Sequence, residues 1–204
     1  MKISKKKFIY LISPNKINNS FYKNLKFVLK TGKISFFQLR LKSYSWDKKM
    51  IIGKEIKNIC KKNKVKFIIN DDPLLALKLD ADGCHLGQKD MNIKIAKKIL
   101  GKKIIGITCH NSINLAKKAI EAKADYIALG AFNQSKTKKI KYLASVKILN
   151  KVKKFTKTPT VAIGGINSIN YKNLLLNNAN FLAISGYIWK NKKYKPLQAI
   201  KRLK

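Results

Sequence analysis

Eight apolar segments of strand length recur along this chain, and they constrain its fold more than any other feature. They are almost continuously hydrophobic, which is typical of strands buried on both faces of a parallel sheet. Segments with helical spacing separate them, such as the stripe formed by Leu143, Val146, Leu149 and Val152. The expected strands are Phe8–Ser13, Phe36–Leu41, Lys66–Asn70, Gly83–Gly87, Ile104–Thr108, Tyr126–Ala131, Thr160–Gly164 and Phe181–Ser185.

Eight strand–helix units in 204 residues predict a single-domain (β/α)₈ barrel over residues 1–204. The alternative, an open doubly wound sheet, needs a glycine-rich loop after its first strand, and Ser13-Pro14-Asn15-Lys16 is not one. In a barrel the chemistry is carried by the loops that follow the strands. We therefore expect the functional residues at the carboxyl ends of the eight segments.

The charge of the chain is extreme but does not indicate a nucleic-acid-binding protein. Lys and Arg number 46 against 9 acids, a formal charge of +37, and all but two of the cations are Lys. Nucleic-acid surfaces favour Arg, whereas here Lys is spread over every helical segment, so a basic nucleic-acid-binding protein ranks last. No segment has the length of a membrane span. Three cysteines without metal or disulfide spacing indicate reduced thiols and a cytoplasmic protein. The oligomeric state cannot be read from the sequence.

Against this basic background, three aspartates stand just after apolar segments. Asp71 and Asp72 follow the third expected strand, and Asp90 lies in the loop after the fourth. Carboxylates held together at strand ends suit Mg²⁺, which keeps several waters and takes further ligands from substrate phosphates. We interpret Asp71 and Asp90 as Mg²⁺ ligands, and Asp72, which precedes a proline, as a helix N-cap.

Anion-binding residues are expected at other strand ends. Alternation places Gln38, Arg40 and Lys42 on one face of the second strand, which is the interior face in a barrel. Arg40 is one of only two arginines, which indicates bidentate recognition of an anion. Gly165 follows the seventh strand, and the loops after strands seven and eight often bind phosphate in these barrels. His85 and His110 are expected to be structural, and no pattern indicates an activated nucleophile.

Six motifs together resemble one family over nearly the whole chain, the thiamin phosphate synthase family. They are Gln38-Leu39-Arg40-x-Lys42, Ile69-Asn70-Asp71, Asp82-Gly83-x-His85-Leu86-Gly87-Gln88-x-Asp90, Gly106-Ile107-Thr108-x-His110, Ser135-x-Thr137-Lys138 and Ala162-Ile163-Gly164-Gly165-Ile166. Thr108 stands where the family usually has Ser, and Ala131 and Gln134 replace prolines common in that loop. These departures concern the rigidity of the loop and its affinity for phosphate, not the reaction.

The resemblance implies an Mg²⁺-dependent transferase that joins hydroxymethylpyrimidine diphosphate to thiazole phosphate and releases pyrophosphate by a dissociative substitution. It implies that Arg40, Thr108 and Lys138 are catalytic and that Asp71 and Asp90 bind the metal. It implies pyrimidine-diphosphate contacts from Gln38, Leu39, Arg40, Leu41, Lys42, Asn70, Thr108 and Lys138. It implies thiazole-phosphate contacts from Ser135, Lys136, Thr137, Gly165, Ile184 and Ser185.

A thiazole tautomerase-like paralogue with the same barrel and phosphate site is the alternative enzyme. Such a protein does not need the Mg²⁺ carboxylates. Asn70 and Asp71, together with Asp90 and Arg40, therefore favour the synthase.

Overall fold

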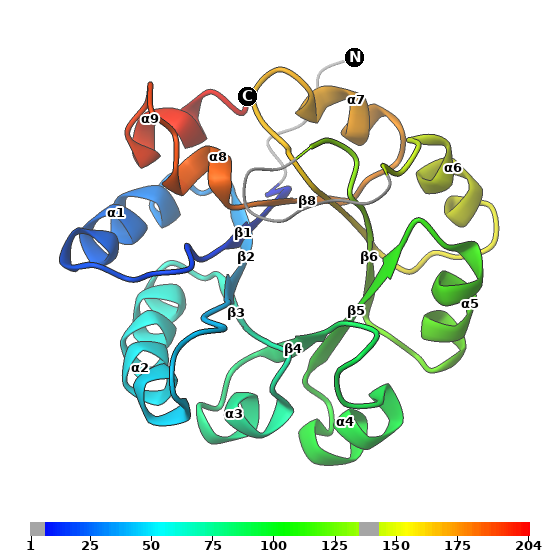
Figure 1. Ribbon diagram of the computed structural model, residues 1–204, viewed down its shortest axis with the longest axis horizontal. Helices are drawn as coiled ribbons and strands as arrows, with labels where there is room; N and C mark the ends of the chain where they lie inside the picture. The colour runs from blue at the N-terminus through cyan, green and yellow to red at the C-terminus, as the bar shows by residue number, and fades with distance from the viewer. Residues whose placement is uncertain (1–6, 135–142) are drawn as a thin grey trace.

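The fold is a closed barrel of parallel strands in the order β1 to β8, surrounded by helices (Figure 1). The structure is a computed structural model that describes residues 7–134 and 143–204. The strands are β1 (Ile9–Ile12), β2 (Ile34–Leu39), β3 (Lys66–Asn70), β4 (Gly83–Leu86), β5 (Ile104–His110), β6 (Tyr126–Gly130), β7 (Thr160–Ile163) and β8 (Phe181–Ile184). The helices are α1 (Asn19–Leu29), α2 (Trp46–Lys62), α3 (Pro73–Lys78), α4 (Ile93–Leu100), α5 (Ile113–Glu121), α6 (Lys147–Lys153), α7 (Tyr171–Leu176), α8 (Gly186–Trp189) and α9 (Pro196–Lys201).

Strand alternation divides the apolar side chains between two cores. Odd and even positions of a strand face opposite sides, so one set packs under the helices and the other fills the barrel. The larger core lies between strands and helices, and burying each Leu or Ile there contributes about 1.5–3 kcal/mol. The inner core is formed by Tyr10, Ile12, Ile68, Tyr126, Ala128, Val161 and Ala183. The predicted single-domain (β/α)₈ architecture is confirmed.

Four helices end in the same local structure, which sets the direction of the following strand. In each, one residue adopts a positive φ and the next N–H bonds back into the helix. In α5 the Lys123 N–H donates to the Ile120 carbonyl and the Ala124 N–H to the Ala119 carbonyl, the two bonds of a Schellman motif. The four left-handed residues are Lys64 (φ 53°), Asp80 (φ 46°), Lys123 (φ 61°) and Asn178 (φ 70°).

The residue just before each of three strands ties the chain to the preceding strand. Its side-chain oxygen accepts a hydrogen bond from a backbone N–H near the start of that strand. A shift of one residue would exchange the inner and outer faces of a strand, so these bonds help to fix which side chains face the barrel interior. The pairs are Asp82 with Phe67 at 2.8 Å, Asp125 with Ile105 at 2.8 Å and Asn180 with Thr160 at 2.9 Å.

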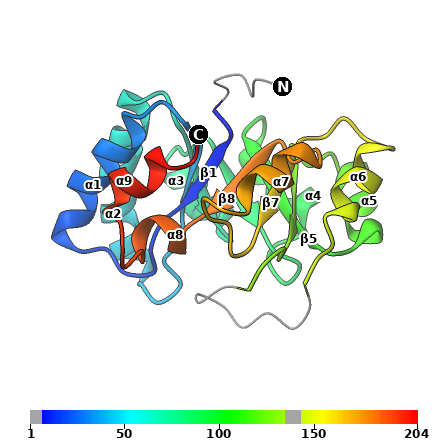
Figure 2. The same ribbon diagram turned by 90° about the horizontal axis from the view of Figure 1, so that it is seen from above.

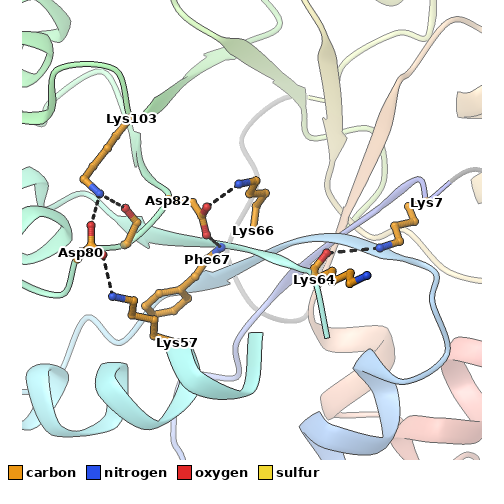
Figure 3. Close-up of polar contacts among 9 residues, drawn as sticks. Lys7, Lys57, Lys64, Lys66, Phe67, Asp80, Asp82 and Lys103 are labelled. Carbon is orange, nitrogen blue, oxygen red and sulfur yellow. Dashed lines mark hydrogen bonds and ion pairs between the residues drawn. The ribbon is translucent and has the colours of Figure 1, made fainter. Parts of the chain in front are cut away.

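Lysine–aspartate ion pairs surround one of these contacts at the amino-terminal end of the strands (Figure 3). Asp82 also pairs with Lys66 at 2.7 Å, and Asp80 joins Lys57 and Lys103 at 3.0 and 2.6 Å. The two ammonium groups lower the pKa of the exposed Asp80 carboxyl to about 2. Exposed pairs of this kind are worth about 0–1 kcal/mol each. Acids at this end of a barrel serve stability, because the chemistry belongs to the opposite end.

Several sequence-based boundaries differ from the observed ones, among them the start of β2 at Ile34 and the end of β5 at His110, and two further differences move predicted residues out of their elements. Strand β2 ends at Leu39 rather than Leu41, so Arg40 and Lys42 lie in the loop after the strand. Helix α6 begins at Lys147, and Leu143 precedes it with an exposed side chain. An apolar stripe cannot distinguish a helical turn from the loop leading into it. The helices of the described chain are all too short or too polar to span a membrane.

Candidate active site at the carboxyl ends of the strands

The predicted pyrimidine-diphosphate residues of the described chain converge at one end of the barrel, the end opposite the lysine–aspartate pairs. Gln38 is buried inside the barrel, as the alternation predicted, and its Nε2 donates to the Tyr10 hydroxyl at 3.0 Å. Arg40 is half-buried, and among the described residues its guanidinium has no hydrogen-bond or ion-pair partner. Asn70 is half-buried at the end of β3. An unpaired guanidinium at the same end of the barrel as these polar groups is suited to bind an incoming anion.

Two carboxylates lie side by side at this end. Asp71 follows β3 in a left-handed conformation with φ 65°, and its N–H donates to the His85 carbonyl at 2.8 Å. This turn brings the Asp71 carboxyl within hydrogen-bonding reach of Asp90 and 3.0 Å from the Lys42 ammonium. The sequence prediction that Asp71 and Asp90 come together is consistent with this geometry. Asp72 accepts a hydrogen bond from the Leu75 N–H at 2.9 Å, so its predicted role as the N-cap of α3 is confirmed.

The two carboxyl groups of this pair titrate differently. Burial raises the pKa of Asp90, and the neighbouring Asp71 carboxylate raises it further. Burial also acts to raise the pKa of Asp71, but the contact with Asp90 and the Lys42 ammonium outweigh it and leave that pKa below its ordinary value. Two ionised carboxylates within hydrogen-bonding reach repel each other, and a cation between them would relieve that repulsion. The pair is therefore a place where positive charge is needed.

The loop after β4 holds Asp90 in position. Its Oδ2 accepts from the Gly87 N–H at 2.7 Å, and a Cβ at Gly87 would stand only 3.0 Å from the same oxygen. The neighbouring Gln88 donates through Nε2 to the Thr108 carbonyl, which ties this loop to β5. The motif His85-Leu86-Gly87-Gln88-Lys89-Asp90 thus folds as a turn whose glycine leaves room for the carboxylate.

A chain of hydrogen bonds crosses the barrel interior beneath these groups, and the sequence did not reveal it. It joins Gln38, Tyr10, Tyr126, His85 and Thr108 through side-chain atoms alone. Burial is the main cause that lowers the pKa of His85, to about 4, so the imidazole is neutral at physiological pH. The tyrosines occupy alternate, inward positions of β1 and β6, and that alternation was the available signal. His85, expected to be structural, lies in the middle of this chain.

The predicted thiazole-phosphate residues are only partly within the described chain. Ser135, Lys136, Thr137 and Lys138 lie outside it. Gly165 has φ 57°, and a Cβ there would meet the Gln134 carbonyl oxygen at 2.2 Å, so the turn after β7 needs glycine whatever it binds. The Ser185 hydroxyl donates to the Ser13 carbonyl at 3.1 Å.

Three of the predicted contact residues have no polar side chain to offer a phosphorylated ligand. The side chains of Leu39, Leu41 and Ile184 are buried in the core between strands and helices. They point away from the barrel interior, and Leu39 and Leu41 line a cavity beside the carboxylate pair, so hydrogen bonds to a phosphate would come from backbone N–H groups.

A cavity of about 500 Å³ opens next to the carboxylate pair. Its lining includes Lys42, Asn70 and Asp71, together with Lys49 of α2 and Met91. It thus reaches from the strand ends toward α2 and α3, which stand beside each other around the barrel (Figures 1 and 2). The volume is that of a small-molecule site.

A parallel barrel whose polar and acidic side chains meet at the carboxyl ends of its strands defines the class, a (β/α)₈-barrel enzyme. The thiamine monophosphate synthase family model matches residues 9–188, and the chain belongs to that family. It is 68% identical over 200 residues to a thiamine-phosphate synthase of Pelagibacter ubique, covering 98% of this chain and 97% of that protein. It is 38% identical to one of Erythrobacter litoralis, over 94% of this chain and 92% of that protein.

A solved structure agrees with this. A thiamine phosphate pyrophosphorylase from Pyrococcus furiosus superposes with a TM-score of 0.85 at 27% identity, covering 98% of this chain and 94% of that one. The resemblance seen in the motifs is thereby confirmed. The chain is a transferase of thiamine biosynthesis with thiamine-phosphate synthase function.

Proposed function

We propose that this enzyme joins hydroxymethylpyrimidine diphosphate to thiazole phosphate, giving thiamin phosphate and pyrophosphate, in a reaction that depends on Mg²⁺. The observation that carries the proposal is the Asp71–Asp90 pair, which lies beside Lys42, at the same end of the barrel as Arg40. Such a site attracts a divalent cation and a polyanion together. The tautomerase alternative has no use for the carboxylate pair.

The residues present fit Mg²⁺ rather than a metal held by protein alone. Across the described chain no three His, Cys, Asp or Glu side chains gather into a metal site. Mg²⁺ is usually bound by one or two carboxylates, and it takes its other ligands from water and substrate phosphates. Two carboxylates are therefore enough protein ligands for it. Asp71 and Asp90 would hold the ion, which when bound would neutralise charge on the departing pyrophosphate.

The proposed reaction needs no protein nucleophile or base. The bond between the pyrimidine methylene carbon and the diphosphate oxygen breaks, and its electron pair leaves with pyrophosphate. The thiazole nitrogen then uses its lone pair to form the new carbon–nitrogen bond, so no proton must move. Arg40 and Lys42, with Lys138 from outside the described residues, would bind the diphosphate, and Gln38, Asn70 and Thr108 would orient it. The two ring nitrogens of the neutral His85 are engaged by Tyr126 and Thr108, and the proposal gives His85 no role as a base.

We place the reaction in the cytoplasm. Cys60, Cys84 and Cys109 are all free and buried, as suits a reducing compartment. Both substrates are small phosphorylated molecules, and we include no nucleic acid or membrane partner in the proposal.

The test is an assay of the purified protein with both substrates, with Mg²⁺ and with a chelator, run beside thermal unfolding. Mg²⁺ should be needed for turnover and should raise the unfolding temperature of the wild type. Asp90→Asn keeps the acceptor for the Gly87 N–H but removes the charge, so it should lose at least about tenfold in kcat and lose the Mg²⁺-induced shift. Asp72→Asn is the matched control, because Asn is also a good N-cap. Full activity in chelator would contradict the proposal.

A further inference from the structure

We propose that Tyr10 and Tyr126 are positioning residues that act through His85 to fix the Thr108 hydroxyl as a hydrogen-bond donor toward the anionic substrate. The inference rests on the proposed function only for the identity of that substrate. It comes from the order of atoms in the hydrogen-bond chain, which lies inside the barrel and ends at two predicted substrate contacts.

The chain is continuous from one side of the barrel to the other. The Tyr10 and Tyr126 hydroxyl oxygens are 2.7 Å apart, and the Tyr126 oxygen is 2.9 Å from His85 Nδ1. The other ring nitrogen, Nε2, is 2.8 Å from Thr108 Oγ1. At the far end, Gln38 Nε2 donates to the Tyr10 oxygen at 3.0 Å. Each distance is that of a normal hydrogen bond.

The donor at the first link sets the direction of every later link. An amide NH₂ can only donate, so Tyr10 accepts from Gln38 and its single proton must go to Tyr126, its other polar partner in the described chain. Tyr126 then donates its own proton to His85 Nδ1. Because Nδ1 accepts, the ring proton must lie on Nε2, which donates to Thr108 Oγ1.

The consequence falls on Thr108. Its oxygen accepts from His85, and within the described residues its hydroxyl has no other partner, so its proton remains to be donated elsewhere. Thr108 is half-buried near the end of β5, on the inward face. A phosphate or pyrophosphate oxygen that has lost its proton can only accept, so a Thr108 fixed as a donor matches it. A chain running the other way would present a lone pair to the anion.

The barrel is shaped to hold the central tyrosine. A Cβ on Gly106 of β5 would lie 1.9 Å from the Tyr126 ring, so glycine at this position makes room for it. The Tyr126 ring stacks on His85 with centroids 5.6 Å apart and planes 13° apart. Tyr10 and Tyr126 are both buried, so water does not compete for their hydroxyl groups.

The first test reads the tautomer of His85 directly. Nitrogen chemical shifts of isotope-labelled histidine separate a protonated ring nitrogen from an unprotonated one, and His110→Gln identifies the signals of the second histidine. We expect the neutral Nε2–H tautomer in the substrate-free protein. The Nδ1–H tautomer would mean that the chain runs from Thr108 to Gln38 and would overturn the inference. This result does not depend on any assay of activity.

The second test breaks the chain. Tyr126→Phe keeps the ring and removes the hydroxyl, so the His85 tautomer should become mixed. We expect kcat/KM for the pyrimidine diphosphate to fall about threefold to tenfold, the effect of one misdirected hydrogen bond, while KM for the thiazole phosphate stays the same. Tyr171→Phe is the matched control, since that buried hydroxyl bonds to the backbone of Lys204 outside the barrel. If the two variants share the same His85 shifts and kinetics, the inference is wrong.

Discussion

Arg40 supplies a chemical group that the many lysines of this protein cannot replace. Arg40 is half-buried at the same end of the barrel as the carboxylate pair, and in the described chain its guanidinium is unpaired. A lysine has enough charge to attract a diphosphate but not the planar fork that holds two of its oxygens. One of the two arginines in the sequence is therefore the residue whose free guanidinium lies at the site.

Arg40→Lys should lower kcat/KM for the pyrimidine diphosphate by a factor that corresponds to about 1.5–3 kcal/mol of transition-state stabilisation. Steady-state kinetics with each substrate varied in turn would measure it. Arg202→Lys is the control, because Arg202 lies over the Tyr194 ring at 4.5 Å and takes no part in the site. Equal kinetics for the two variants would show that Arg40 does not bind the diphosphate.

His85 makes stability depend on pH. Burial lowers its pKa from 6.5 to about 4, so between these values the unfolded chain binds a proton that the folded protein does not. Stability from the neutral imidazole is thus complete above pH ~6.5 and is lost as the pH falls toward 4, by about 2–4 kcal/mol. Urea unfolding in the presence of chelator should show that the free energy of unfolding falls more steeply between pH 7 and 4.5 for the wild type than for His85→Gln. Parallel curves would contradict a buried neutral His85.

At the scale of elements, the loops that lead into the strands repeat one design. A helix ends with a left-handed residue, then comes a buried residue, and in three of the four cases an Asp or Asn then bonds to the preceding strand. No glycine occupies the left-handed positions, although glycine adopts that conformation without steric cost. Substituting glycine at these positions should therefore increase the free energy of unfolding.

Lys123→Gly should stabilise the protein by about 0.5–1 kcal/mol, because φ 61° is unfavourable for a residue with a Cβ. Lys118→Gly, in the last part of the same helix, should do the opposite by about the same amount. Denaturant unfolding of both variants measures the pair of effects. If Lys123→Gly were less stable than the wild type, the contacts of the Lys123 side chain would stabilise the protein by more than the left-handed backbone conformation destabilises it.

For the whole molecule, self-repulsion outweighs ion pairing. The charge is +37, whereas ion pairs within the described chain engage only Asp71, Asp80 and Asp82. Salt screens both effects, but the uncompensated cations greatly outnumber the pairs. Repulsion of this size destabilises the compact state without affecting which fold it adopts.

Raising NaCl from about 0.02 M to about 0.5 M should therefore raise the unfolding temperature, by about 2–8 °C if screening recovers ~1–2 kcal/mol. Thermal unfolding followed by circular dichroism would measure the shift. KCl should act like NaCl, because screening depends on ionic strength. A fall in the unfolding temperature would mean that the few ion pairs contribute more than the repulsion removes.

The sequence by itself determined the barrel, because eight buried parallel strands need near-continuous apolar segments and each of those segments is visible in the chain. It also determined that Gln38 faces inward and that Asp72 caps a helix, since both follow from local periodicity and capping chemistry. Only the tertiary structure decided that β2 ends before Arg40 and that the side chains of Leu39, Leu41 and Ile184 face away from the barrel interior. Only the structure showed that Tyr10, Tyr126 and His85 are hydrogen-bonded to one another. Tyr10 and Tyr126 are 116 positions apart and meet only because the barrel closes, and a local sequence pattern carries no information about that closure.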